Sequence, residues 1–526
     1  MPSRRKFIKT TLASGAVLAL PAMRETAAQA PAVITSERMR PQPTSGLQIG
    51  DVTGDRALVW SRADRPARML VERSFHEDFR DAVRVRGPLA LETTDYTARL
   101  DLTALPSGRE VFVRVVFEDL SSGKTLSEPL SGKFRTPPAG RRDVTFAWSG
   151  DTAGQGWGIN QDWGGMKCYE ALRRERPDFF VHCGDTIYAD GPIAAQVKLA
   201  DGSTWKNLVT EEVGKVAETL KEFRGRYAYN LMDDNVRRMS AEVPQVWQWD
   251  DHEVTNNWSD SKDLSADKRY TEKNVALLTA RATRAFLEWA PLRWHGADES
   301  ERVYRRIAYG PLLDVFVIDM RSYRGPNSYN RQEKPGPDAA FLGQTQLAWL
   351  KDGLKRSKAR WKVISADMPI GLVVGDGRDA EGRERFEAVA NGDGPALGRE
   401  LEFANLFSYL KKEKIQNVVW ITADVHYCAA HYYDPSKAQF TDFNPFWEFV
   451  AGPMHAGGFG PNALDNTFGP RVEFVKAPDG RVNVSPTEGG QFYGLAKIDG
   501  KSGALKVQIK DLNGATLYEK SVAPQG

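Results

Sequence analysis

The sequence Phe-Phe-Val-His-Cys-Gly-Asp-Thr-Ile-Tyr, residues 179–188, places an apolar run directly ahead of an acidic turn. The apolar run predicts a buried strand, and the Gly-Asp pair that follows predicts a turn. Loops at the carboxyl ends of strands are where ligands gather in α/β sheets. The stretch therefore predicts an α/β fold that carries Asp185 and Tyr188 just beyond a strand end.

Similar apolar runs recur through residues 143–526, and helical patterns separate several of them. The predicted strands are 144–149, 179–183, 243–249, 312–318, 361–366 and 418–422, and the predicted helices are 166–174, 211–227, 273–289 and 344–355. This alternation is typical of an α/β architecture. Residues 492–498 and 504–509 predict a closing antiparallel hairpin.

Residues 41–137 have a different pattern, in which short alternating runs stand between turn residues. The runs 57–61, 67–72, 96–102 and 111–116 predict an all-β sandwich. Pro137-Pro138-Ala139-Gly140 reads as a linker to the larger domain. Because no ionisable cluster stands out in this region, packing against the larger domain is favoured over ligand binding.

Residues 1–30 resemble a twin-arginine export signal. Arg4 and Arg5 precede an apolar run over 12–23, and Ala28-Gln29-Ala30 fits a cleavage site. The apolar run is too short for a comfortable membrane span, and no other segment is long and apolar enough. We therefore expect a protein that uses the twin-arginine export machinery, has no transmembrane segment and works in the periplasm or outside the cell. The alternative is a basic, frayed N-terminus.

The charge and the cysteines exclude two classes of protein. Without residues 1–30, which hold five Lys or Arg and one acidic residue, the chain has a formal net charge of −2. It lacks the basic excess of a nucleic-acid binder, so no stable nucleic-acid partner is expected. Cys168, Cys183 and Cys428 give no disulfide framework. Buried free thiols are favoured over a Cys168–Cys183 bridge.

Four predicted strands end in turns that carry Asp or His. The turns are Ser-Gly-Asp-Thr at 149–152, Cys-Gly-Asp-Thr-Ile-Tyr at 183–188, Trp-Asp-Asp-His-Glu at 249–253 and Ala-Asp-Val-His at 423–426. A lone Gly-Asp is more often a turn than a ligand, and a lone His is often a core residue. The ordered set predicts a metal site, because strands fix the backbone while the loops aim oxygen and nitrogen ligands.

The order of these turns resembles the calcineurin-like metallophosphoesterase superfamily. Residues 184–188, 249–258 and 424–426 look like its branch of PhoD-like alkaline phosphatases and phosphodiesterases, and Asp-Asp-His-Glu-Val-Thr-Asn-Asn at 250–257 is the most diagnostic run. The resemblance runs from the β-sandwich to near Gly457. It implies an α/β sandwich of two mixed sheets flanked by helices, preceded by a fibronectin type III-like domain.

The resemblance also implies two metals, Fe(3+) and Ca(2+). The oxygen-rich ligand set would also suit other divalent metals. The implied first site is Asp151, Asp185, Tyr188 and His426, and the second is Asp185, Asp251 and Asp424 with Asn256 nearby. Asp185 would bridge both metals, and Tyr188 would bind as a phenolate. Cations about 3.5–4 Å apart would activate a bridging hydroxide for in-line attack on phosphorus.

Three further residues are candidates for contact with the substrate. His252 would bind the phosphoryl group or protonate the leaving alkoxide, with a structural role as the alternative. Arg321 would bind phosphate as a bidentate donor, although a surface or Asp-paired arginine fits its position equally well. His455 is a weaker candidate, and Asp190 and His431 are placed around the site or on the surface.

Two functions of different class remain open from the sequence. The first is an exported metal-dependent hydrolase of small-molecule phosphomonoesters, phosphodiesters or both, with phospholipids as a further candidate substrate. The second is a non-catalytic exported metal- or phosphate-binding protein with an attachment β-sandwich. His252 favours the hydrolase. Two departures from the family stand out: Trp148-Ser149-Gly150-Asp151 has no cysteine where the best-known PhoD-like enzymes place one, and the chain ends in predicted strands rather than a helix.

Overall fold

Three predicted strands with acidic ends lie side by side in the largest sheet of this computed structural model. β8 (Val144–Ser149), β9 (Phe179–Cys183) and β12 (Gln245–Gln248) run parallel. The full order is β24 (Thr516–Val522), β23 (Leu505–Asp511), β22 (Phe492–Ile498), β8, β9, β12, β1 (Pro43–Thr53), β2 (Arg56–Ala63) and β5 (Thr97–Leu102). The structure describes residues 40–121, 123, 125–294, 299 and 301–526, so the predicted export signal at 1–30 lies outside the described residues.

A second large sheet supplies the other strand ends. Its order is β13 (Arg305–Tyr309), β14 (Leu313–Val317), β15 (Trp361–Ser365), β18 (Val418–Thr422), β20 (Phe446–Val450), β19 (Cys428–Tyr433) and β21 (Pro470–Lys476). Strands β14, β15, β18 and β20 are parallel, whereas β13 and β19 pair antiparallel with their neighbours. Parallel strands aligned in this way bring their carboxyl ends to one edge of the sheet.

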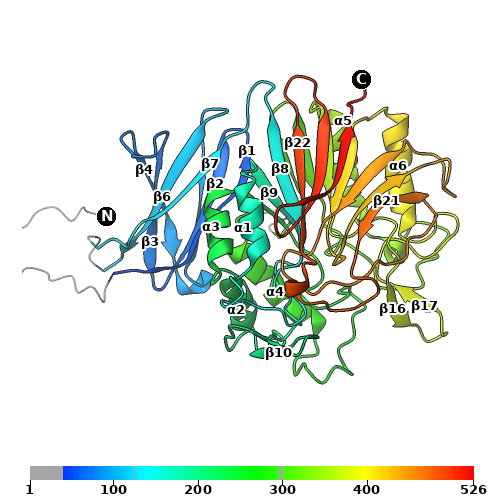
Figure 1. Cartoon of the computed structure of the whole chain (residues 1–526), viewed down its shortest axis with the longest axis horizontal. Helices are drawn as coiled ribbons and strands as arrows, with labels where there is room; N and C mark the ends of the chain where they lie inside the picture. Colours follow the sequence, from blue (N-terminus) through cyan, green and yellow to red (C-terminus); the bar gives the residue numbers. More distant parts are fainter. Residues whose placement is uncertain (1–39, 122, 124, 295–298, 300) are drawn as a thin grey trace, which may run out of the picture. The chain divides into compact units, whose positions relative to one another are not determined.

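The two sheets pack face to face, and helices cover their outer faces. Buried Phe146, Val181, Val315 and Phe449 belong to one apolar core between the sheets. Helices α1 (Lys167–Arg174), α2 (Leu220–Asn230), α3 (Asp234–Glu242) and α4 (Val275–Trp289) pack on the nine-stranded sheet, and α5 (Gln344–Arg356) and α6 (Glu400–Lys412) pack on the seven-stranded sheet. Figure 1 shows α6 and α1 on different sides of the strands. The predicted class, an α/β sandwich of two mixed sheets flanked by helices, is confirmed.

One predicted helix begins later than its sequence pattern indicates. The pattern predicts a helix over 211–227, but α2 starts at Leu220. Thr219 caps it: its side chain accepts from the amide of Glu222, while the Glu222 carboxylate accepts from the amide of Thr219. This reciprocal capping box stabilises a helix start at that point, so the apolar residues ahead of it pack as turns instead.

The N-terminal strands form a β-sandwich that shares a sheet with the larger region. The four-stranded sheet runs β4 (Val83–Ala90), β3 (Ala67–Ser74), β6 (Glu110–Asp119) and β7 (Leu130–Arg135), and it packs on β1, β2 and β5. Strand β1 also pairs parallel with β12 through Gly50 and Gln245. Buried Asp51 accepts hydrogen bonds from Arg305 and from the backbone of Arg293. Residues 40–526 thus form one unit.

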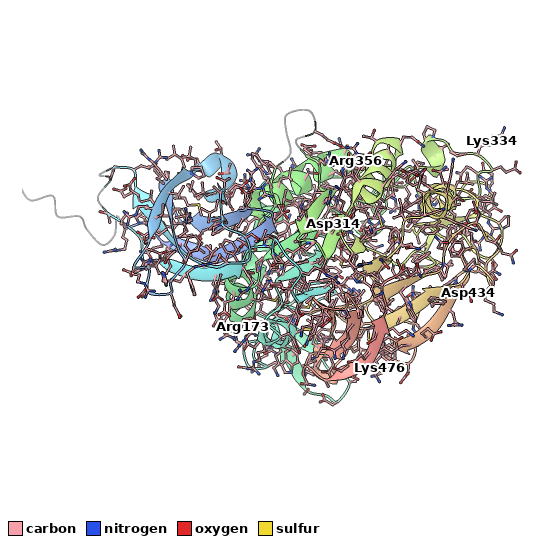
Figure 2. All side chains as sticks on the ribbon, turned by 90° about the horizontal axis from the view of Figure 1, so that it is seen from above. Arg173, Asp314, Lys334, Arg356, Asp434 and Lys476 are labelled. Carbon is pink, nitrogen blue, oxygen red and sulfur yellow. The ribbon has the colours of Figure 1, made fainter. Side chains whose placement is uncertain are left out.

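The remaining elements are short. They are the hairpins β10 (Gln196–Lys198) with β11 (Thr204–Lys206) and β16 (Gly375–Arg378) with β17 (Glu384–Phe386), and the 3-10 helices Glu92–Thr94, Pro337–Ala339 and Pro486–Glu488. The three cysteines, all within the described residues, are buried free thiols as predicted. Charged side chains such as Lys334 and Arg356 point outward in Figure 2. Among the described helices, none has the length and apolarity needed to span a bilayer.

Candidate metal centre

Three of the predicted ligands adopt a left-handed backbone just beyond their strands. The φ angles of Asp151, Asp185 and Asp424 are 65°, 50° and 62°. Non-glycine residues adopt this region rarely and at some cost, so it persists where the surroundings fix it. Close packing fixes the turn at Asp185, because a Cβ placed on the preceding residue, Gly184, would lie 2.4 Å from the Cβ of Asp250. The sharp turns direct the carboxylates toward the space between the strand ends.

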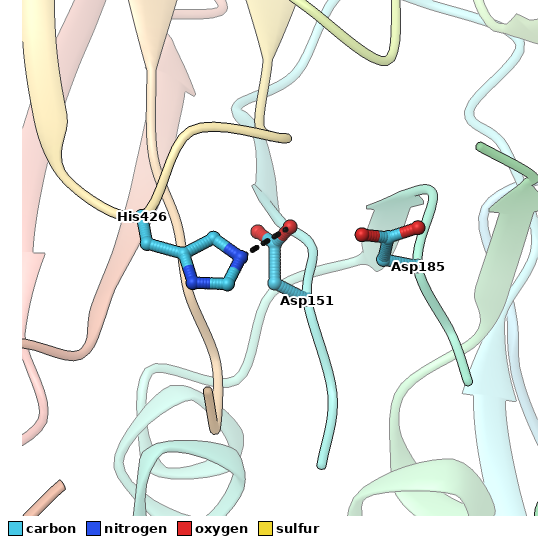
Figure 3. Close-up of side chains that lie close together, drawn as sticks. All are labelled: Asp151, Asp185 and His426. Atoms are coloured by element: carbon cyan, nitrogen blue, oxygen red, sulfur yellow. Dashed lines mark ion pairs between the residues drawn. The ribbon is translucent and has the colours of Figure 1, made fainter. Parts of the chain in front are cut away.

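The first candidate metal group consists of Asp151, Asp185 and His426. One ligand atom from each lies within 4.8 Å of the others, and Figure 3 shows the His426 ring directed at Asp151 with Asp185 beyond it. Nδ1 of His426 donates to the carbonyl of Gly457 at 2.6 Å. This bond leaves Nε2 free to accept, 2.7 Å from the Tyr188 hydroxyl and 3.4 Å from Oδ1 of Asp151. Metal-binding histidines are oriented by such a bond from the other ring nitrogen.

The second group consists of Asp185, Asp251 and His252, with ligand atoms within the same 4.8 Å limit. Nδ1 of His252 lies 2.6 Å from Oδ1 of Asp190, and because a carboxylate only accepts, Nδ1 carries the proton. The His252 side chain is 17% exposed, so this group opens toward solvent. Burial opposes a charged imidazole, but the carboxylates of Asp190, Asp251 and Asp185 together raise the pKa of His252 well above its usual value.

The carboxylates of both groups are short of positive partners. Across the described part of the chain, no Lys or Arg forms an ion pair with Asp151, Asp185 or Asp251. Burial, followed by repulsion from Asp251, Glu253 and Asp151, raises the pKa of Asp185 well above its usual value. Oδ2 of Asp151 and Oδ1 of Asp251 are buried without a hydrogen-bond partner. Unpaired buried carboxylate oxygens are costly, so the donor set fits hard cations.

Glu253, the last residue of the Asp-Asp-His-Glu turn, is a site residue to which sequence reasoning assigned no role. Its buried carboxylate accepts from the backbone amides of Asp185 at 3.2 Å, Thr186 at 2.6 Å and Asp250 at 2.7 Å. It therefore ties the turn after β12 to the turn after β9. Its place in the diagnostic run is the only sequence signal for that role.

The structure places the other candidates outside the two groups. Asp424 is half-buried and belongs to neither group, and Asn256 is exposed, with its backbone amide donating to Oδ2 of Asp190 at 3.0 Å. Arg321 is fully buried and pairs with Asp250, Asp367 and Glu387, which is the Asp-paired alternative left open by the sequence.

The remaining histidines and Asp190 have partners of their own. His455 is buried and its Nε2 contacts the carbonyl of Gly158 at 3.0 Å. His431 pairs with Glu448 at 2.9 Å within the seven-stranded sheet. Asp190 is buried and contacts His252, in keeping with the first of the two places, around the site or on the surface, that the sequence left open for it. Its position two residues after Tyr188 gave no signal of that contact.

Two family descriptions match the chain. "PhoD-like phosphatase, N-terminal domain" matches residues 26–138, and "PhoD-like phosphatase" matches residues 146–509. The chain is 26% identical to alkaline phosphatase D of Bacillus subtilis (strain 168) over 475 residues, which covers 84% of this chain and 75% of that protein.

Solved structures show the same fold. A structure of PhoD superposes with a TM-score of 0.66 at 21% identity and covers 92% of this chain and 93% of the other. A purple acid phosphatase, PPD1 from yellow lupin (Lupinus luteus) seeds, superposes with a TM-score of 0.57 at 13% identity, covering 91% and 74%. The second family match alone spans more than half of the sequence, and it contains both carboxylate groups. The chain belongs to the PhoD-like phosphatase family and is a phosphoester hydrolase.

Proposed function

We propose that this chain is an exported phosphoesterase that works with two metal ions. The observation that carries the proposal is a buried cluster of carboxylates that has no Lys or Arg partner in the described part of the chain and lies next to a histidine that carries a proton. Asp151, Asp185, Tyr188 and His426 would hold one metal, and Asp185 and Asp251, with Asp424 and Asn256 nearby, would hold the other. When bound, the metals would activate water and neutralise phosphoryl oxygens. Fe(3+) and Ca(2+) are the proposed pair.

His252 is the proposed proton donor to the leaving oxygen. Its Nδ1 is tied to Asp190, so Nε2 is the nitrogen that remains for the substrate. Asp190 is itself fixed, because its Oδ2 accepts from the amide of Asn256 at 3.0 Å. A carboxylate that holds the imidazole also favours its protonated form, as a general acid requires. His252 is partly exposed, which lets a leaving group reach it.

Arg321 and His455 are proposed to act on the site indirectly. The guanidinium of Arg321 is committed to buried carboxylates, and the buried ring of His455 contacts the carbonyl of Gly158 through Nε2. In place of the direct phosphate contact expected from the sequence, we propose that both residues position the turns around the metals. Asp250 supports this view, because its Oδ1 accepts both from Arg321 and from the amide of the ligand Asp251.

The proposed substrates are small phosphomonoesters and phosphodiesters, with phospholipids as a further class. Export by the twin-arginine machinery to the periplasm or beyond is proposed from residues 1–30 alone. The division into a sandwich at 41–137 and a catalytic domain at 143–526 is likewise a proposal; the shared nine-stranded sheet would make the sandwich a support for β12.

Turnover of a chromogenic monoester and a chromogenic diester tests the function. We expect hydrolysis by the purified protein, its loss after chelation, and its return with added metal. His252→Ala should lower kcat by about 10²–10⁴-fold. The non-catalytic alternative would instead give metal or phosphate binding without chelator-sensitive turnover of either ester. That result would refute the proposed chemistry.

A further inference from the structure

We propose that Asp376, on the hairpin β16–β17, is a positioning residue for the metal ligand Asp251 and couples the hairpin to metal binding. The inference rests on the proposed two-metal function. No motif in the sequence points to Asp376, which lies 125 positions after Asp251. The connection between them runs through Asn257, at the end of the diagnostic turn.

Asn257 is held by three hydrogen bonds. Its backbone amide donates to Oδ2 of Asp251, its side-chain Nδ2 donates to Oδ1 of Asp376 at 2.9 Å, and its carbonyl accepts from Nδ2 of Asn327 at 3.0 Å. The φ angle of Asn257 is 56°, in the left-handed region. That conformation aims the amide at Asp251, and it needs outside contacts to persist.

Asp376 is the acceptor on which this arrangement depends. Its Oδ2 takes a second hydrogen bond, from Nδ2 of Asn327 at 2.9 Å. Asn327 is 3% exposed, and its Oδ1 accepts from Arg324 and Arg399, which fixes the direction of its amide group. Without Asp376, two amide donors would lose their common acceptor and Asn257 would lose its side-chain anchor.

The other end of the hairpin is tied to the same region. Glu387, one residue beyond β17, pairs with Arg321, which in turn contacts Asp250 beside Asp251. One end of the hairpin therefore contacts the turn that follows β12 directly, through Asn257, and the other end is linked to that turn through Arg321. Because coupling between two sites is reciprocal, a metal that fixes Asp251 also fixes Asn257 and favours the docked hairpin.

The test compares Asp376→Ala with a matched control, Asp379→Ala. Asp379 lies in the same hairpin, and among the described residues its side chain accepts only from the amide of Glu381 and from Arg383, both in the hairpin. Both variants and the wild type are stripped of metal and titrated with Ca(2+) or Fe(3+) against a chelator of known affinity. We expect Asp376→Ala to bind one of its two metals about 10–100-fold more weakly, as loss of an outer hydrogen-bond partner does. Asp379→Ala should match the wild type.

Hydrogen exchange of the hairpin gives a second readout. Added metal should slow exchange of the β16 and β17 amides in the wild type and in Asp379→Ala, but not in Asp376→Ala. Asp376→Asn keeps one acceptor oxygen, so its metal affinity and amide exchange should lie between those of the wild type and Asp376→Ala. This graded result would distinguish a lost contact from a general folding defect. If Asp376→Ala bound metal and exchanged its amides as the wild type does, that result would overturn this inference and leave the proposed function standing. Absence of metal binding in the wild type would overturn the proposed function as well.

Discussion

Two buried acidic clusters lie next to each other in this chain, and they are neutralised differently. In one, Asp250, Asp367 and Glu387 surround the buried guanidinium of Arg321. In the other, Asp151, Asp185 and Asp251 have no Lys or Arg ion pair among the described residues. Buried carboxylates need a compensating charge. The first cluster contains its own positive charge, in Arg321. The second would need an external one, which is why we propose it as the metal site.

Asp250 and Asp251 show how sharp the division is. They are consecutive in the sequence, yet Asp250 contacts Arg321 whereas Asp251 lies with Asp185 and His252. A third acidic group, the pair Glu400 and Asp465, has neither an arginine partner among the described residues nor a place in the proposed metal site. Burial and the neighbouring Asp465 raise the pKa of Glu400 to about 9, so this pair retains a proton at neutral pH. Each of these three acidic groups can therefore be disrupted by a substitution of its own.

The largest effect should come from Asp185→Ala, because Asp185 belongs to both metal groups. We expect phosphoesterase activity to fall by about 10³-fold or more, since several kcal/mol of transition-state stabilisation depend on the metals. Elemental analysis should show loss of metal. Near-normal rate and metal content in this variant would contradict the assignment of Asp185 as the shared ligand.

Arg321→Met should act on stability instead. Removing the guanidinium leaves buried Asp250 and Asp367 without their arginine partner, whereas Glu387 keeps Arg324. Such a loss costs about 3–5 kcal/mol of unfolding free energy. Urea unfolding of metal-free protein measures it. Arg356→Met is the control, because Arg356 forms an exposed helical pair with Asp352 that is worth about 0.5 kcal/mol or less. Equal losses in the two variants would remove the distinction between the clusters.

Chelation should destabilise only a protein whose metal cluster is intact. With free metal at about 100–1,000 times its Kd, removal of the metal should lower the unfolding free energy by about 3–4 kcal/mol. Asp185→Ala should show no such change, whereas Arg321→Met should retain it. Thermal unfolding with and without chelator provides the measurement, and a chelator-insensitive wild type would argue against bound metal.

The sequence predicted the fold class and the gathering of acidic strand ends because both follow from local patterns. Apolar runs followed by Gly-Asp specify strand and turn together at Asp151 and Asp185, and the run before Ala-Asp-Val-His does the same at His426. The choice of Asp251 over Asp250 came from the family resemblance and not from a local pattern, since the difference depends on Arg321, in the turn that follows β14. Asn327 and Asp376 were missed for the same reason. Their contacts join segments 49 to 119 residues apart, and no periodicity in the sequence records them.

Per pH unit, the smallest change in unfolding free energy should come from Glu400 and Asp465, the pair that holds a proton. Because the pKa of folded Glu400 is raised to about 9 from about 4.5, its stabilising contribution is present in full below pH 4.5 and is lost as pH rises to 9. Glu400→Gln keeps a donor toward Asp465 without titrating, so the variant should lose less stability between pH 5 and 9. One proton corresponds to at most about 1.4 kcal/mol per pH unit. Urea unfolding across this range checks it, and identical pH profiles for wild type and variant would mean that Glu400 is already ionised at neutral pH.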